Sequence, residues 1–215
     1  MRTGLALLCA VWLLGLMIGP GHAGPWPRDK AAVFLALSRT SGAFGESQVY
    51  GEYGLGRRRT LVTEAATSRA GWRGQLLVRH ALSPGKRGAQ MALALGVVVV
   101  APQTIKPQAA LRVGLLWGKG FSGRLPGWVS VEALADLGPG GVATRSTTTL
   151  GLKPRPELMS ILQLQTETSA TGVMIHAATS MVWEARKGLS LELGLRQGIV
   201  GSAARQVKLG SWISF

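Results

Sequence analysis

The sequence predicts an all-β fold of about twelve short strands, with a removable leader in front of them. Apolar and polar residues alternate with a period of two in segment after segment. Gly, Pro and polar residues separate these segments, and no long apolar block follows residue 23. A period of two puts every second side chain on the same face, so each segment has one apolar and one polar face.

The leader, residues 1–23, has the pattern of a signal peptide. Arg2 gives a positive start, an apolar core of signal-peptide length follows, and Gly21 and Ala23 place small residues before a cleavage site. We expect cleavage there, with residues 24–215 as the folded domain. The alternative is an uncleaved membrane anchor, for which the apolar stretch is short. The domain itself contains no cysteine, so no disulfide can stabilise it after export.

The first strands along the chain alternate least regularly, and "RTLVTEAAT" is the weakest of them. The middle strands are stricter. In "QMALALGVVVV", Met91, Leu93, Leu95, Val97 and Val99 all share one face. The expected strands of this first part cover residues 31–39, 47–55, 59–67, 72–82, 90–100, 111–118 and 127–136.

The remaining strands end with the clearest pattern of all. In "LSLELGLRQG", Leu189, Leu191, Leu193 and Leu195 lie on one face of a strand, whereas a helix would scatter them around its circumference. The expected strands of this second part cover residues 142–152, 157–167, 173–186, 189–198 and 205–215.

Two all-β architectures fit this alternation. A soluble sandwich or barrel turns its apolar faces inward, and a transmembrane barrel turns them to lipid. The polar faces mix small residues with scattered charges, which suits a narrow lumen. Tryptophans near strand ends suit an interfacial belt, although they also cover the cores of soluble sandwiches. These are Trp26, Trp72, Trp128, Trp183 and Trp212.

The final strand, "VKLGSWISF", supports the membrane alternative. Val207, Leu209, Ile213 and Phe215 share one parity, while Ser211 interrupts it. This pattern resembles the C-terminal signature of bacterial outer-membrane β-barrel proteins. Stretches such as "VYGEYGLGRRRTL" and "LGLKPRPELMSILQLQ" look like small uncharacterised porin-like proteins of Gram-negative bacteria.

This resemblance implies a closed antiparallel transmembrane β-barrel of about 12 strands (10–14 possible) in the bacterial outer membrane. It implies contact with outer-membrane lipid and lipopolysaccharide, and recognition of the final strand by the barrel-assembly machinery. An even strand count would place both termini on the periplasmic side. The oligomeric state stays open.

The net charge of the whole chain is +14. A basic chain can bind nucleic acid, but export and the even spread of the basic residues argue against that partner. A polyanionic surface such as lipopolysaccharide fits an exported basic protein better.

The charged residues on the polar faces nearly balance in sign and form our candidate lumen and selectivity set. Because a barrel of this size is only modestly wide, we expect a narrow channel or passive transporter for small solutes or ions, with a weak preference for anions. The alternatives are an outer-membrane barrel without a pore, structural or lipid-modifying, and a soluble periplasmic β protein. The set is Arg73, Arg79, Arg112, Glu132, Asp136, Arg145, Glu167, Glu184, Arg186, Glu192, Arg196 and Lys208.

No catalytic motif stands out. After the leader, the chain has two histidines, His80 and His176, and no asparagine. Ser180 shares a strand face with His176, but four residues along a strand span about 13 Å, too far for a hydrogen bond. His, Cys and Asp do not cluster as metal ligands do, so we expect no catalytic residue, metal or cofactor.

Overall fold

The computed structural model describes residues 24–42, 45–82, 88–104, 106–170 and 172–215. The predicted leader, residues 1–23, and its cleavage site lie outside the described residues. Within them, no helix is long and apolar enough to cross a membrane. The strands are β1 (Val33–Thr40), β2 (Ser47–Gly54), β3 (Arg59–Ser68), β4 (Gly71–Ala81), β5 (Ala89–Pro102), β6 (Gln108–Phe121), β7 (Gly127–Gly138), β8 (Gly141–Arg155), β9 (Leu158–Ser169), β10 (Gly172–Arg186), β11 (Leu189–Val200) and β12 (Arg205–Ser214).

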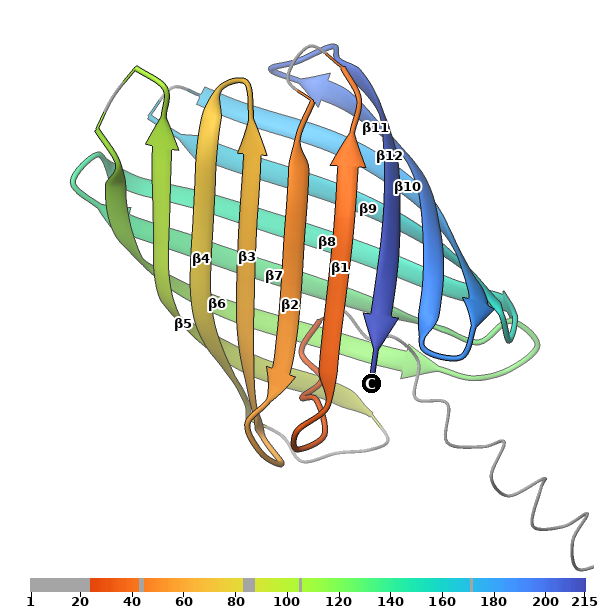
Figure 1. The fold of residues 1–215 in the computed structure, drawn as a ribbon. Coiled ribbons are helices and arrows are strands. Elements are labelled where there is room, and N and C mark those ends of the chain that lie inside the picture. Colours follow the sequence, from red (N-terminus) through yellow and green to blue (C-terminus); the bar gives the residue numbers. More distant parts are fainter. Residues whose placement is uncertain (1–23, 43–44, 83–87, 105, 171) are drawn as a thin grey trace, which may run out of the picture.

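These twelve strands form one closed antiparallel barrel in which each strand pairs with its neighbours in sequence, and β12 pairs with β1 (Figure 1). The last residue takes part in the closure. The Val33 N–H donates to the Phe215 carbonyl at 2.8 Å, and the Phe215 N–H donates back at 3.1 Å. The predicted closed barrel of twelve strands is confirmed, and closure leaves no unpaired strand edge.

The two faces of the barrel wall differ as the alternation predicts. On β5, Leu93 and Leu95 are 48% and 57% exposed on the outer face, while Ala94 between them is buried inside at 6% exposure. Interior positions include charged residues, such as Arg112 at 3% exposure. An apolar exterior around a polar, charged interior is the arrangement of barrels that span membranes.

The two ends of the barrel can be named from the chain. The terminal end holds the start of β1 and the end of β12, and the C-terminus is marked there in Figure 1. The loop end is the opposite one and holds the β1–β2, β3–β4 and β11–β12 connections. Strand register shifts near the terminal end of β10, between Glu184 and Arg186.

Candidate functional site in the barrel interior

The barrel interior has two unlike halves. The apolar half lies toward the terminal end and contains a cluster of Trp128, Met159, Ile161 and Val182. The polar half lies toward the loop end and contains most of the charged side chains that point inward. The same strands line both halves, so the strands alone do not determine what fills each half.

Trp128 is the largest side chain of the apolar half and is 2% exposed. The Trp128 ring lies over Gly151, which pairs with Trp128 from β8. A side chain larger than that of glycine at position 151 would meet this ring. Trp26 and Trp212 pack against the same cluster. The expectation of an interfacial belt is therefore wrong for these three tryptophans, whose packing partners lie inside. Trp72 and Trp183 do lie on the outer face near strand ends, each 50% exposed.

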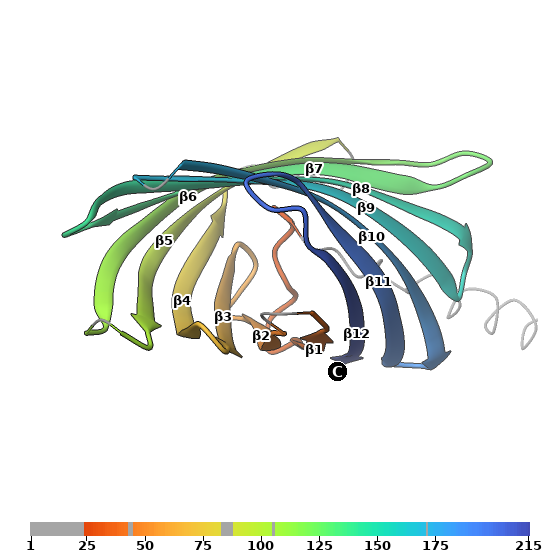
Figure 2. The same ribbon diagram turned by 90° about the horizontal axis from the view of Figure 1, so that it is seen from above.

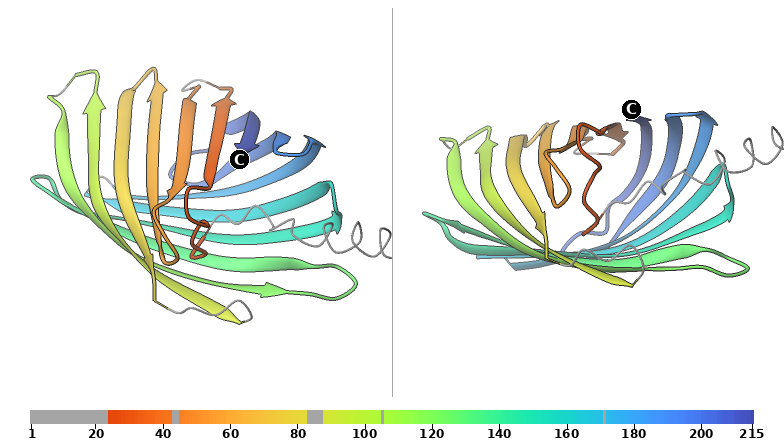
Figure 3. Two further views of the ribbon diagram at one scale, coloured as in Figure 1. Left: turned by 60° about the horizontal axis from the view of Figure 1, so that its bottom comes forward. Right: turned by 90° about the horizontal axis from the view of Figure 1, so that it is seen from below.

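The chain ahead of β1, residues 24–32, folds back into the apolar half, and we call it the strap. Figures 2 and 3 show it between opposite walls of the barrel. Pro25 is among the largest fully buried residues of the described chain. On β6, Gly118 makes room for it, because a β-carbon there would lie 2.9 Å from Pro25 and 2.6 Å from the Trp26 ring.

Polar contacts fix the strap to the wall. The Arg28 N–H donates to the Thr60 hydroxyl at 2.9 Å, and the Arg79 guanidinium donates to the Trp26 carbonyl at 3.4 Å. The Arg28 guanidinium also lies 4.6 Å from the centre of the Phe34 ring, within cation–π range. The strap is thus bound through backbone, charge and packing together.

Glu52, on β2, is the centre of this attachment and is 2% exposed. Its carboxylate accepts from Arg28 of the strap, from Arg79 at 2.8 Å and from the Tyr50 hydroxyl at 2.6 Å. A buried carboxylate needs such partners, because removal from water disfavours an unpaired charge by several kcal/mol. One wall residue therefore holds both the strap and β4.

Charge pairs of the polar half run along the wall between nearby strands. The Arg112 guanidinium on β6 donates to both carboxylate oxygens of Asp136 on β7, at 2.5 and 2.6 Å. Arg73 on β4 contacts Glu64 at 3.1 Å and Glu46 at 3.2 Å.

Two more pairs complete this pattern. Arg145 contacts Glu167 at 3.1 Å, and Lys208 contacts Glu192 at 3.0 Å. The Glu192 carboxylate also accepts from the Trp212 indole N–H at 3.0 Å, which links the polar half to the apolar half.

A cavity of about 310 Å³ runs through the polar half. It begins at Gly24 of the strap and reaches Thr40 and Glu46 at the loop end. A second cavity of about 170 Å³ lies at the terminal end and is lined by Arg28 and Glu184. The strap contributes residues to both cavities and lies between them.

The charges that line the larger cavity are five cations and four carboxylates. Within the described part of the chain, Arg196 and Glu132 have no ion pair, and the buried Arg196 Nε has no hydrogen-bond partner. Among the described residues, Arg196 and Glu132 are therefore the two lining charges that no ion pair holds, one of each sign. The charged lining residues are Glu46, Glu64, Arg73, Arg79, Glu132, Arg145, Glu167, Arg196 and Lys208.

Seven of the twelve residues proposed from the sequence line this cavity. Arg112, Asp136 and Glu192 lie outside its lining in wall pairs, and Glu184 lines the terminal-end cavity. Arg186 differs from the expectation that it faces the lumen. It is exposed, because the register shift after Glu184 breaks the alternation used to assign it.

Sequence reasoning missed several interior residues. Glu52 shares the face of Tyr50 on β2, and Glu64 shares the face of Val62 on β3. Their positions in the sequence are consistent with an inward face, but the alternation of apolar and polar residues is weakest in these two strands. Nothing periodic marks the strap. Within the described ranges, no group of three or more His, Cys, Asp or Glu could hold a metal ion.

Comparison with known proteins matches this chain to solved structures alone. No family model and no curated protein matches it. The KdgM porin aligns with a TM-score of 0.65 and 8% identity over 85% of this chain and 99% of that chain. The NanC porin aligns with a TM-score of 0.59 and 9% identity over 85% and 100%. An outer membrane channel from Pseudomonas putida F1 aligns with a TM-score of 0.57 and 11% identity over 92% and 100%.

Identities this low show a shared fold and leave solute and mechanism to be argued from this chain's own residues. The fold inferred from the resemblance in the sequence is confirmed. The chain forms a small porin-like β-barrel, similar in architecture to outer-membrane channels.

Proposed function

We propose that the protein is an outer-membrane barrel that forms a narrow channel for small solutes, with a weak preference for anions. The observation that carries this proposal is the charged cavity in the polar half, enclosed by a barrel with an apolar exterior. The named channels with the same fold support it. Export by a cleaved leader, residues 1–23, and periplasmic termini belong to the same proposal.

The strap sets the width of the proposed path. It lies between the two interior cavities and is held by Glu52, Arg79 and Thr60. A solute that crosses the barrel must therefore pass beside the strap or displace it. This favours small ions and solutes with a low conductance over wide, unselective passage.

The selectivity assignment rests on the balance of charges in the cavity. Five cations face four carboxylates, and Arg196 has no ion pair within the described residues. Counted over the lining alone, this is an excess of one positive charge, which favours anions only weakly, because Arg79 and Lys208 pair with Glu52 and Glu192 outside the lining. Among the residues predicted from the sequence, Arg73, Arg145, Arg196 and Lys208 are proposed to form this positive path.

Planar-bilayer recordings of refolded residues 24–215 test the channel directly. Discrete, small current steps and a reversal potential that favours anions in a salt gradient would support it. A heat-dependent shift in gel mobility, measured on the same sample, establishes that the barrel is folded. A folded barrel that passes no current would sink the channel proposal.

A barrel without a pore is the second candidate, and the strap specifically favours it. Deep burial of Pro25 and three hydrogen-bonded or ionic attachments could hold the strap in place permanently. The protein would then have a structural or lipid-modifying role. Current that appears only after the strap is removed would distinguish this candidate from an open narrow channel.

Assembly is a further part of the proposal. Val207, Leu209, Ile213 and Phe215 alternate along the last strand, and Leu209 and Phe215 are 61% and 72% exposed on the outer face. We propose that this face is what the barrel-assembly machinery recognises before β12 closes against β1. Phe215→Ser should lower the amount of folded barrel in the outer membrane of expressing cells.

A further inference from the structure

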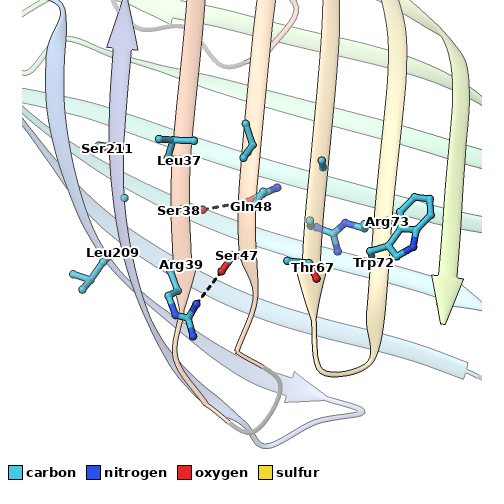
Figure 4. A pocket seen from close by; sticks show the side chains of 14 residues that line it. Leu37, Ser38, Arg39, Ser47, Gln48, Thr67, Trp72, Arg73, Leu209 and Ser211 are labelled. Atoms are coloured by element: carbon cyan, nitrogen blue, oxygen red, sulfur yellow. Dashed lines mark hydrogen bonds between the residues drawn. The ribbon is translucent and has the colours of Figure 1, made fainter. Parts of the chain in front are cut away.

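The outer surface carries a groove near the loop end, across β12, β1, β2, β3 and β4. Figure 4 shows Trp72 at one edge and Leu209 at the other, with Leu37 between them. The small side chains of Ala65 and Ser211 also line it, and its volume is about 710 Å³. Elongated apolar hollows of this kind on a lipid-facing surface fit a single acyl chain better than the flat surface of a strand ladder does.

A polar hollow of about 590 Å³ adjoins the groove on the side of the loop end. The two share Arg39, Ser47 and Thr67, and the polar hollow adds Arg69. The Arg39 guanidinium donates to the Ser47 hydroxyl at 3.1 Å. The polar hollow is lined by further hydroxyls from Thr40, Ser41 and Ser68.

The charge of this polar hollow is uncompensated. Its lining includes no acidic side chain, and neither arginine has an ion pair within the described residues. The nearest acidic residue in sequence, Glu46, pairs with Arg73 and lines the interior cavity instead. Two exposed guanidinium groups with hydroxyl donors around them match a phosphate group, which arginine binds through paired hydrogen bonds.

We propose that the groove and the polar hollow together bind one molecule of lipopolysaccharide through its lipid A part. A lipid A phosphate contacts Arg39 and Arg69, and one acyl chain lies in the groove beside Trp72. The loop end is opposite the termini, so it faces the outer leaflet in the proposed orientation. The inference rests on the proposed membrane placement but not on channel activity.

Lipid A fits better than a phospholipid because of the charge that the polar hollow offers. A phosphate monoester carries up to two negative charges, and the polar hollow offers two cations and five hydroxyls. Trp72 lies at the loop end of β4, which places the site at the depth of the lipid headgroups for either lipid. Phosphatidylglycerol, a phosphodiester with one charge, is the competing ligand to test.

Native mass spectrometry of refolded residues 24–215 in uncharged detergent provides the test, with hexa-acylated bisphosphoryl lipid A as the probe. We expect a one-to-one adduct with the unaltered protein. The variant Arg39→Ala/Arg69→Ala should bind lipid A at least about tenfold more weakly, since it loses two charge-assisted contacts. Ala65→Phe fills the groove without changing charge and should also weaken binding.

The matched control is Arg124→Ala/Arg155→Ala, which removes two exposed arginines near the terminal end. It should bind like the unaltered protein. Equal weakening of lipid A binding in both double variants would show general charge attraction and would overturn the site. Unchanged binding in Arg39→Ala/Arg69→Ala would overturn it too. Equal binding of phosphatidylglycerol would overturn the choice of lipid A.

The heat-dependent gel shift is measured for every variant, so that misfolding is not taken for lost binding. Failure of the channel proposal is separable from failure of this one. A folded barrel that passes no current but binds lipid A through Arg39 and Arg69 would leave the lipid site intact.

Discussion

The polar half and the apolar half of the interior have the same walls and different contents. In the polar half, inward side chains are charged and pair along the wall, as Arg112 does with Asp136. In the apolar half, inward side chains such as Trp128 and Met159 pack against a segment that is not part of the sheet. The comparison shows that alternation decides which side chains enter the barrel, whereas the strap, a segment outside the sheet, fills the apolar half.

Removal of the strap should break this contrast most strongly. A barrel that begins at Ala32 loses Pro25 and Trp26 from the apolar half, so its two cavities should merge. We expect a several-fold rise in single-channel conductance compared with residues 24–215. An unchanged conductance in a folded, strap-free barrel would show that the strap does not limit the path.

Glu52→Ala should have the largest effect on stability. The change leaves Arg28 and Arg79 without their carboxylate and lowers the free energy of unfolding by about 3–5 kcal/mol. Urea titration of the refolded barrel measures this. The control Glu157→Ala removes an exposed carboxylate from the β8–β9 connection and should change stability by less than about 0.5 kcal/mol.

Gly118→Leu should displace the strap without shortening the chain. A side chain at this position would occupy the space of Pro25 and of the Trp26 ring. Conductance should rise, although by less than after strap removal, because the displaced strap remains tethered. Gly120→Leu is the matched control on the same face of β6, where the nearest atom to a β-carbon lies at 3.9 Å. Equal conductance in the two variants would argue against displacement.

Arg196→Gln should have the smallest effect, confined to the polar half. It removes the cavity cation that lacks an ion pair and leaves four cations against four carboxylates. The reversal potential in a salt gradient should move toward zero with little change in conductance. Arg186→Gln changes the same charge at an exposed position and should leave the reversal potential where it is.

The twelve strands could be predicted because each one buries one face and exposes the other. The alternation of Leu189, Leu191, Leu193 and Leu195 survives in β11 as an outward apolar row. It fails near the end of β10, where the register shifts. Arg186 is the example, because a bulge before it moves the side chain out of the expected face.

The strap could not be predicted, because residues 24–32 have no periodicity and their partners are far away in sequence. Thr60, Arg79 and Gly118 gain their relation to the strap only when the barrel closes. The tryptophans could have given a partial signal. Trp128 shares its parity with Ser130 and Glu132, which already placed it on the inward face.

A designed disulfide between Pro25→Cys and Gly118→Cys tests the central claim, that the strap occupies the barrel interior. A β-carbon at Gly118 would lie 2.9 Å from the Pro25 Cγ, the place that a sulfur at position 25 would take, so a sulfur at each position can come within bonding distance. Residues 24–215 contain no other cysteine. We predict that mild oxidation of the folded barrel forms this bond nearly completely, and that the pair Pro25→Cys with Gly120→Cys forms far less. Equal or absent bond formation in the two folded barrels would contradict the account.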